Sequence, residues 1–255
     1  MDISVNVGDD HVAVVEFDNP PHNHFDMAML GGLADVYERL EDDPACRAIV
    51  LSSTGRHFCA GADFSDGADF GDGAVLAVRA IYEQAYRLFA AGLPVVAAVQ
   101  GAAVGGGLGL ALSADFRVAA PPTRFQANFA RLGIHHGFGL TVTLPRAIGE
   151  QRAAELLLTG RAVKGEEALA IGLCDRLAPP DELRAHAHAF AAEIAAGAPI
   201  AVRSMRATIR GDLAERVNAA TDREAAEQAE LFTTEDFREG VSASRERRSP
   251  RFDGR

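Results

Sequence analysis

The sequence predicts an α/β protein with a helical C-terminal part. Short runs of consecutive apolar residues, such as Val95 to Val99, recur between longer amphipathic segments, and such runs are typical of strands buried on both faces of a sheet. From about Gly149 onward the pattern is almost entirely helical. The chain has 255 residues, enough for one domain with a subdomain, and we predict an α/β core at 1–195 and a helical subdomain at 196–255.

The first predicted elements are a hairpin and a capped helix. Apolar and polar residues alternate from Ile3 to Val7 and from Val12 to Phe17, and the turn-forming residues Gly8 to Asp10 separate the two runs. Asp26 is placed to cap a helix that runs to about Glu41. The elements that follow are a strand at Ala48 to Ser52, a loop rich in Gly and Asp at Thr54 to Gly73, a helix at Ala74 to Ala90, and strands at Val95 to Val99 and Phe116 to Ala119.

The second half of the chain predicts a series of helices. Apolar residues at helical spacing, such as Leu213, Val217 and Ala220, form stripes on the helices from Pro199 onward, and we expect a trimer or hexamer to bury these stripes. The predicted helices are Gln151 to Leu158, Gly165 to Ile171, Asp181 to Ala196, Pro199 to Arg210, Asp212 to Phe232 and Glu235 to Arg247.

Composition narrows the class of protein. The net charge of −11 argues against a general basic surface for nucleic acid. No apolar run reaches the roughly 18 residues of a membrane helix, and the acidic, alternating N-terminus is unlike a signal peptide. Cys46, Cys59 and Cys174 are odd in number and match no metal or disulfide spacing. We therefore expect a cytoplasmic protein without nucleic-acid, membrane or metal partners.

Two glycine-rich turns are the most informative segments. Phe58 to Phe64 follows one predicted strand, and Gln100 to Gly109 follows another and opens a helix. Small residues let a ligand approach the backbone, and a helix N-terminus offers unpaired N–H groups, so the two turns together could form an oxyanion hole. Close packing is the alternative reading of these glycines. A dinucleotide fingerprint is excluded because Leu110 stands where its third glycine is needed.

Five segments resemble the crotonase (enoyl-CoA hydratase/isomerase) superfamily, and the resemblance extends along the full chain. It implies a spiral of ββα units, a C-terminal helical trimerisation subdomain, and assembly into a homotrimer or hexamer. The segments are NPPHNHFD (Asn19 to Asp26), GRHFCAGADF (Gly55 to Phe64), VVAAVQGAAVGGGLGLALSADFRVA (Val95 to Ala119), FARLGIHHGFG (Phe129 to Gly139) and EDFREGVSASRERRSPRF (Glu235 to Phe252).

The resemblance also implies a ligand and the residues that hold it. The ligand is an acyl-CoA thioester, so coenzyme A is part of the substrate and no separate cofactor is expected. By motif position, the backbone amides of Ala62 and Gly106 would receive the thioester carbonyl. The adenine end of CoA would lie near Asn23 to Phe25 and Ala60 to Ala62, and Arg247 would reach a CoA phosphate in a neighbouring subunit.

The sequence departs from the hydratases at both catalytic glutamates. The motif position of the first glutamate is Gly109, and that of the second is Phe129. Neither residue transfers a proton, whereas a hydratase uses one carboxylate as base and another as acid. We therefore do not expect hydration by the usual pair, and isomerisation is disfavoured too because the isomerases generally keep the second glutamate.

Replacement acid/base groups are available nearby. His135 and His136 lie on the segment that faces the acyl group in the family, and imidazole has a suitable intrinsic pKa. The alternative is that they cap the turn or contact a neighbouring subunit. Tyr82 and Tyr86 are interpreted as packing residues. The acidic loop adds the candidate carboxylates Asp66, Asp69 and Asp72.

Two functions stay open at this point. The first is an enzyme, a lyase or isomerase acting on CoA thioesters through a thioester enolate, in fatty-acid or carboxylic-acid metabolism. The second is a non-catalytic acyl-CoA carrier or sensor. The enzyme is the leading hypothesis and the carrier is the alternative, because both amide-donor turns are intact while both glutamates are absent.

Overall fold

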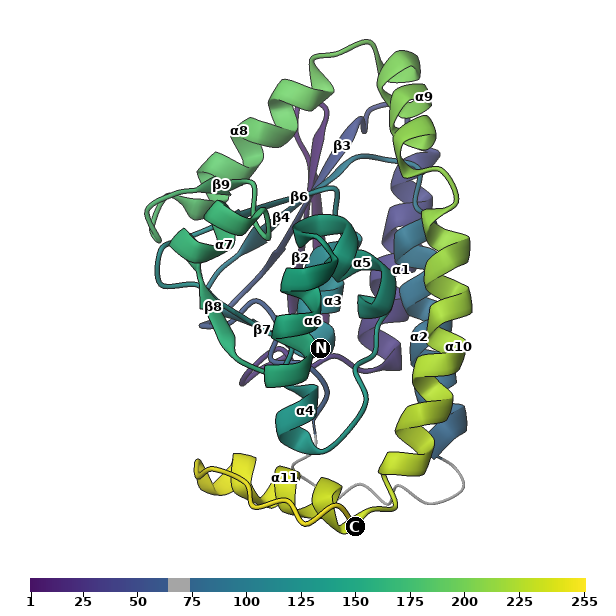
Figure 1. Ribbon diagram of the computed structural model, residues 1–255. Coiled ribbons are helices and arrows are strands. Elements are labelled where there is room, and N and C mark those ends of the chain that lie inside the picture. Colours follow the sequence, from purple (N-terminus) through teal and green to yellow (C-terminus); the bar gives the residue numbers. More distant parts are fainter. Residues whose placement is uncertain (64–73) are drawn as a thin grey trace.

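The computed structural model describes residues 1–63 and 74–255, and it contains a six-stranded sheet, five strands of which come from the N-terminal half (Figure 1). The strand order is β1-β2-β3-β4-β6-β9, with an antiparallel β1–β2 hairpin followed by parallel pairs. Every residue of β3 and β4 is buried, as their continuous apolar sequences predict. The strands are β1 (Asp2–Val7), β2 (Val12–Asp18), β3 (Ala48–Ser53), β4 (Val95–Val99), β6 (Phe116–Ala119) and β9 (Arg176–Leu177).

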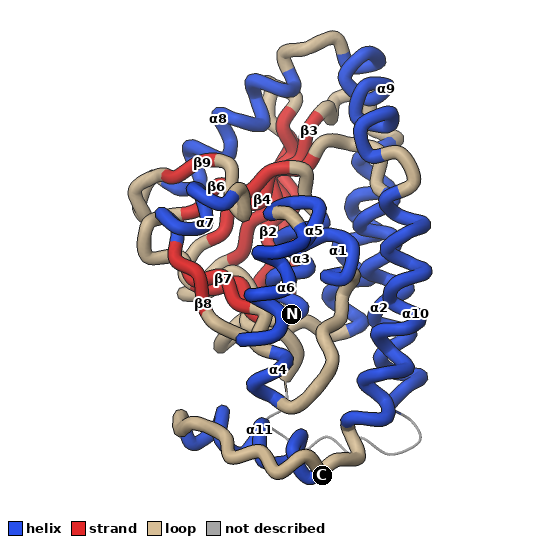
Figure 2. The backbone as a smooth tube through the Cα atoms, in the orientation of Figure 1, coloured by secondary structure: helices blue, strands red, loops and turns tan. Residues whose placement is uncertain are grey.

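Helices cover both faces of this sheet, which confirms the α/β class (Figure 2). One face packs against α8 (Leu183–Ala195) through its buried alanines and Leu183. The other face packs against α1 (Met27–Glu41), α2 (Ala74–Ala90) and α3 (Gly106–Ser113). The predicted cap of α1 is confirmed, since the Asp26 carboxylate accepts a hydrogen bond of 2.7 Å from the Met29 amide.

A second, three-stranded sheet was not predicted from the sequence. It has the order β5-β7-β8, formed by β5 (Ala102–Val104), β7 (Arg124–Gln126) and β8 (Ala162–Lys164). A parallel bridge between Cys59 and Ala103 joins β5 to the first glycine-rich turn. The second sheet therefore ties together the two turns that the sequence singles out.

The second half is helical, as predicted, except for β8 and β9. It also contains α4 (Phe129–Leu132) and α5 (Leu140–Ile148), which had not been predicted. The 1–195 and 196–255 division stays a prediction, because α10 and α11 pack against α5, α2 and α4. The other helices are α6 (Glu150–Thr159), α7 (Gly165–Ile171), α9 (Pro199–Arg210), α10 (Leu213–Leu231) and α11 (Glu235–Glu246).

One detail of the expected stripes is corrected by the structure. Leu213 and Val217 are buried by their own chain, because α10 packs against α2 and α5. The apolar residues that face outward lie instead on α9, where Ile200, Met205 and Ile209 are 85%, 57% and 71% exposed. Within the described residues, no helix is both long and apolar enough to cross a membrane.

Candidate functional site

A cavity of about 740 Å³ lies beside the two glycine-rich turns. Its volume is in the range of roughly 300–1,000 Å³ that is usual for small-molecule sites. The walls come from the loop before α1, the turn at 60–63, α2, the start of α3, α4, the segment 134–138, and helices α10 and α11. Most of the lining side chains are apolar, so the cavity is suited to an acyl or aromatic group.

The first turn is held against β5 by backbone hydrogen bonds. The Cys59 amide donates to the Ala102 carbonyl at 3.1 Å, and the Val104 amide donates back to the Cys59 carbonyl at 3.0 Å. Gly61 has a φ of +94°, a conformation that glycine adopts without steric cost. The chain reverses there and places Ala62 in the cavity wall.

The second turn approaches the first so closely that only glycine fits. A Cβ atom at Gly107 would lie 2.2 Å from the Cys59 carbonyl oxygen, well inside van der Waals contact. Gly105 has a φ of +57° and a ψ of −123°, and its amide donates to the Gln126 carbonyl at 2.8 Å. These contacts set the N-terminus of α3 directly beside the first turn.

The amides of Ala62 and Gly106 both belong to residues that line the cavity. Among residues 1–63 and 74–255, no acceptor receives a hydrogen bond from either amide. A Cβ atom on Gly61 would lie 3.9 Å from the Gly106 nitrogen, so the two turns are in contact at this point. The arrangement leaves two N–H donors and the positive end of the α3 dipole available to a ligand.

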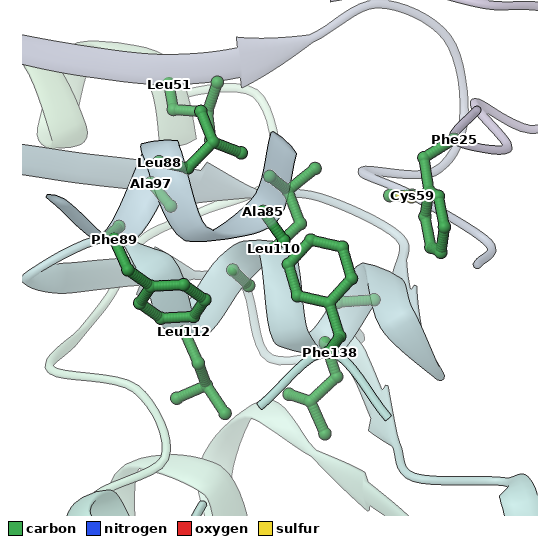
Figure 3. Packing of buried hydrophobic residues seen from close by; sticks show 14 of the residues in the cluster. Phe25, Leu51, Cys59, Ala85, Leu88, Phe89, Ala97, Leu110, Leu112 and Phe138 are labelled. Atoms are coloured by element: carbon green, nitrogen blue, oxygen red, sulfur yellow. The ribbon is translucent and has the colours of Figure 1, made fainter. Parts of the chain in front are cut away.

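The aromatic ring of Phe138 packs directly against Gly109, the last residue of the second turn. Gly109 is buried, and a Cβ atom there would lie 2.6 Å from Cβ of Phe138. Phe138 is 1% exposed, and its ring packs at centroid distances of 5.4 Å from Phe25 and 6.5 Å from Phe89 (Figure 3). Phe129 lines the cavity with a second apolar ring. Both glutamate positions therefore contribute apolar packing in place of a carboxylate.

A buried glutamate holds Phe138 in this position. Glu224 on α10 is 1% exposed, and its carboxylate accepts hydrogen bonds from the amides of Gly139 (2.8 Å) and Thr141 (3.0 Å) and from the Thr141 hydroxyl (2.6 Å). Burial raises its pKa. These bonds fix a turn in which Phe138 has a φ of +62°. Glu224 was not predicted from the sequence as a functional residue, although a charged residue on the core-facing stripe of a helix is an available signal.

The two candidate histidines, His135 and His136, are not among the described residues that line the cavity. Nε2 of His136 lies 2.8 Å from the Thr141 hydroxyl and 4.0 Å from the Glu224 carboxylate, and the two imidazole rings stack. Burial, with the neighbouring His135, lowers the pKa of His136 to about 4. An acid/base role for either residue stays a prediction, and the geometry gives it no contact with the cavity.

The expected CoA contacts are placed as follows. Phe25 and Ala60 line the cavity. The side chain of Asn23 is engaged within the chain, since its amide donates to the carbonyls of Thr54 and His57 at 2.8 Å and its oxygen accepts from the Asn19 amide at 2.8 Å. Its side chain stabilises the loop, and a backbone contact there stays a prediction.

The C-terminal candidate lies at the end of α11. Arg247 is the C-cap of that helix, with a φ of +55°, and Arg245, two residues earlier in the last turn, lines the cavity. The contact of Arg247 with a neighbouring subunit stays a prediction. The candidate carboxylates Asp66, Asp69 and Asp72 lie outside the described residues. In the described part of the chain, no group of three or more His, Cys, Asp or Glu is arranged to hold a metal ion.

The cavity wall also contains a polar pair, formed by Tyr82, which the sequence had led us to interpret as a packing residue, and Gln228. The Tyr82 hydroxyl donates to Oε1 of Gln228 at 2.9 Å, and Nε2 of Gln228 donates to the His135 carbonyl at 2.9 Å. Both residues are buried and line the cavity. Burial, with the Glu224 charge as a second cause, raises the pKa of Tyr82, so its hydroxyl is neutral at physiological pH.

The fold is that of a known class of protein. The chain belongs to the enoyl-CoA hydratase/isomerase family, whose sequence model matches residues 8–255, and the crotonase resemblance is thereby confirmed. A probable enoyl-CoA hydratase of Rhodobacter capsulatus is 37% identical over 246 residues, which cover 96% of this chain and 95% of that protein. The crotonyl-CoA hydratase of Syntrophomonas wolfei is 33% identical over 86% of this chain and 85% of its own length. The crystal structure of an enoyl-CoA hydratase/isomerase from Pseudoalteromonas atlantica has a TM-score of 0.86 at 30% identity, covering 98% of this chain and 99% of that chain.

Proposed function

We propose that this protein binds the CoA thioester of a carboxylic acid and holds the thioester carbonyl with the amides of Ala62 and Gly106. The observation that carries the proposal is the pair of amides without a partner in the described chain, at the wall of a largely apolar cavity. Relatives named enoyl-CoA hydratase and crotonyl-CoA hydratase agree with a thioester ligand.

The same two amides would favour chemistry at the carbon next to the carbonyl. Two N–H donors and a helix N-terminus stabilise negative charge on the oxygen, so an enolate is the anion that the site suits best. Hydration by two carboxylates is not part of the proposal, because Gly109 and Phe129 occupy those positions. We place the activity in fatty-acid or carboxylic-acid metabolism.

A non-catalytic acyl-CoA carrier or sensor is the second candidate. The observation that favours it is the Phe138 side chain, which fills the space beside Gly109 and makes that wall of the cavity apolar. A carrier needs the two amides and the apolar cavity but no group that transfers a proton.

The role of the carbonyl is tested by comparing butanoyl-CoA with S-butyl-CoA, a thioether that lacks only the carbonyl oxygen. Calorimetry should give a dissociation constant about tenfold lower for the thioester, because the thioether leaves both amides without an acceptor. Equal affinities would contradict the carbonyl contact. Absence of binding by both ligands would contradict the whole proposal.

The two candidate functions are separated by hydrogen exchange at the α-carbon. Butanoyl-CoA is incubated with the protein in D₂O, and deuterium uptake is followed by mass spectrometry. An enolate-forming enzyme incorporates deuterium at that carbon faster than the uncatalysed control. A carrier binds the thioester and leaves the uptake at the control rate.

A further inference from the structure

Three phenylalanine rings lie against the turn that carries the second amide donor. A Cβ atom on Gly106 would lie 2.4 and 2.5 Å from two ring carbons of Phe25 and 3.2 Å from a ring carbon of Phe138. A Cβ atom on the preceding residue, Gly105, would lie 3.7 Å from the tip of the Phe129 ring. The rings come from three separate segments, namely the loop before α1, the start of α4 and the loop before α5. The fold thus gathers them at the second glycine-rich turn.

All three rings belong to the wall of the cavity. Phe25 and Phe129 are each 8% exposed and Phe138 is 1% exposed, so the surrounding core holds the rings in place. Phe25 and Phe138 form an edge-to-face pair, with centroids 5.4 Å apart and an interplanar angle of 63°. The wall next to Gly106 is therefore aromatic and already packed.

A thioester held at the Gly106 amide places its acyl group beside these rings. Its carbonyl oxygen would lie about 2.9 Å from the amide nitrogen, and the next carbons of the acyl group are only one or two bonds from the carbonyl. The first part of the acyl group is thus the part that meets the aromatic wall. Aliphatic lining residues, such as Ile81 and Leu132, bury a saturated and an aromatic group alike. Discrimination between the two groups must come from the rings.

A flat aromatic group gains more from this wall than a saturated group of the same size. Aromatic rings pair edge to face or offset, with centroids about 4.5–7 Å apart, and these contacts stabilise beyond the burial of apolar area. Phe25 and Phe138 show this geometry with each other. A ligand ring beside them extends the same packing, whereas a saturated ring has neither a π face nor the polarised edge of an arene.

Building on the proposed function, we propose that the preferred ligand is an aryl-substituted acyl-CoA whose aromatic ring begins within two carbons of the thioester carbonyl and packs against Phe25, Phe129 and Phe138. The short separation follows because the three rings contact Gly105 and Gly106 themselves. The phenylalanines are then specificity-determining residues of the acyl pocket. A straight alkyl chain is the alternative that the test must exclude.

The test compares three pairs of CoA thioesters that differ only in the saturation of one six-membered ring. The pairs are benzoyl-CoA with cyclohexanecarbonyl-CoA, phenylacetyl-CoA with cyclohexylacetyl-CoA, and 3-phenylpropanoyl-CoA with 3-cyclohexylpropanoyl-CoA. The two members of a pair have equal numbers of carbons, and the saturated member is the more apolar, so burial alone would favour it. Calorimetry with the native protein should show that the phenyl member of at least one pair binds about fivefold or more tightly than its partner.

Variants assign the preference to the rings. Phe25→Leu and Phe129→Leu each keep an apolar side chain and remove one ring, so each should lower the phenyl-to-cyclohexyl affinity ratio by about twofold or more. A disturbance of the carbonyl contact would weaken both members equally and leave this ratio unchanged. Phe190→Leu is the matched control, because Phe190 packs against Phe116 on the other face of the sheet, outside the cavity lining. Circular dichroism verifies that each variant is folded, and either cavity variant suffices.

The outcomes distinguish this inference from the proposed function. If the thioesters bind and no phenyl member is favoured over its partner, the aryl preference is wrong and the proposed function stands. The same conclusion follows if octanoyl-CoA binds more tightly than all three aryl thioesters. A native preference that persists unchanged in both Phe25→Leu and Phe129→Leu also overturns the inference. If no thioester binds at all, both proposals fail.

Discussion

At position 109 the residue has no side chain, and Phe138 occupies the volume beside it. The two residues are in contact inside the core, where Gly109 is buried and Phe138 is 1% exposed. Alanine at 109 would place its Cβ atom 2.6 Å from Cβ of Phe138. The fit between these two residues therefore determines which side chains the cavity wall can accept.

We expect Gly109→Ala to lower the free energy of unfolding. Alanine is favoured over glycine in a helix by up to about 1 kcal/mol, but overpacking a core costs about 1–3 kcal/mol. In a Phe138→Gly background all three atoms that meet the new Cβ are gone, and the same substitution should become neutral or stabilising. Urea denaturation of the four proteins measures this coupling, and an equal loss in both backgrounds would refute the assigned contact.

His136 predicts a dependence of stability on pH. Its pKa is lowered to about 4 from an ordinary value of 6.5, so between these values the unfolded chain binds the proton and the folded chain does not. The stability that the neutral imidazole contributes is thus lost as pH falls from about 6.5 towards about 4.

The measurement compares the native protein with His136→Gln by urea denaturation at pH 7 and pH 5. The native protein should lose more free energy of unfolding than the variant over this interval, by at most about 1.4 kcal/mol per pH unit. His186→Gln, an exposed histidine on α8, serves as control. An identical pH dependence of native protein and His136→Gln would contradict the lowered pKa.

At the element scale, the short second sheet brings the two amide-bearing turns together. β5 continues into the N-terminus of α3, and its bridge to Cys59 aligns the first turn beside it. Gly107 permits the close approach of α3, because any Cβ atom there would overlap the Cys59 carbonyl. The spacing between the Ala62 and Gly106 amides thus depends on Gly107 and on the β-bridge between Cys59 and Ala103.

We expect Gly107→Ala to weaken the binding of butanoyl-CoA by about tenfold or more, because it must push α3 away from the first turn and misplace the Gly106 amide. Gly197→Ala is the matched control: its Cβ atom would meet Val202 at 2.8 Å, far from the cavity lining. Calorimetry gives the affinities and thermal unfolding gives the stabilities. Equal affinity of both variants would rule out the proposed spacing.

The helices were the most predictable elements. The Asp26 cap and the apolar spacing of Ala74 to Ala90 are local signals, and both helices are confirmed. β5, β7 and β8 each have three residues, too few for alternation to be recognised. They form only because distant segments pair, which one local stretch of sequence does not encode.

The candidate site, like the fold, was predictable from the sequence only where its signals are local. The two glycine-rich turns were identified from local composition, and the structure brings them into contact. Glu224 was missed because its partners lie more than eighty residues away in the sequence. Tyr82 was assigned to packing because its hydrogen bond to Gln228 spans 146 residues. Interactions of this separation follow from the fold and leave no local pattern.

At the scale of the whole molecule, α9 has an inverted polarity. Its arginines face the core, where Arg206 and Arg210 each bind Asp115 at 2.8 Å. Its apolar residues Ile200 and Ile209 are 85% and 71% exposed. The helix itself lies at the edge of the molecule (Figure 1). A monomer with this surface exposes an apolar helix face, and covering such a face is a common role of assembly.

We therefore predict that the protein is a trimer or hexamer in solution and that α9 contributes to its interface. Multi-angle light scattering at micromolar concentration should give three or six times the 27.0 kDa chain mass. The double variant Ile200→Asp/Ile209→Asp should shift the mass towards the monomer, because it buries charge in the interface. A monomeric mass for the native protein would contradict the prediction.

The central claim concerns two amides and one carbonyl oxygen, and a crystal structure of the protein with butanoyl-CoA tests it most directly. We predict that the thioester oxygen lies about 2.7–3.2 Å from the backbone nitrogens of both Ala62 and Gly106, with the acyl chain directed towards Phe138. A bound thioester whose carbonyl oxygen lies more than about 3.5 Å from both nitrogens would contradict the claim.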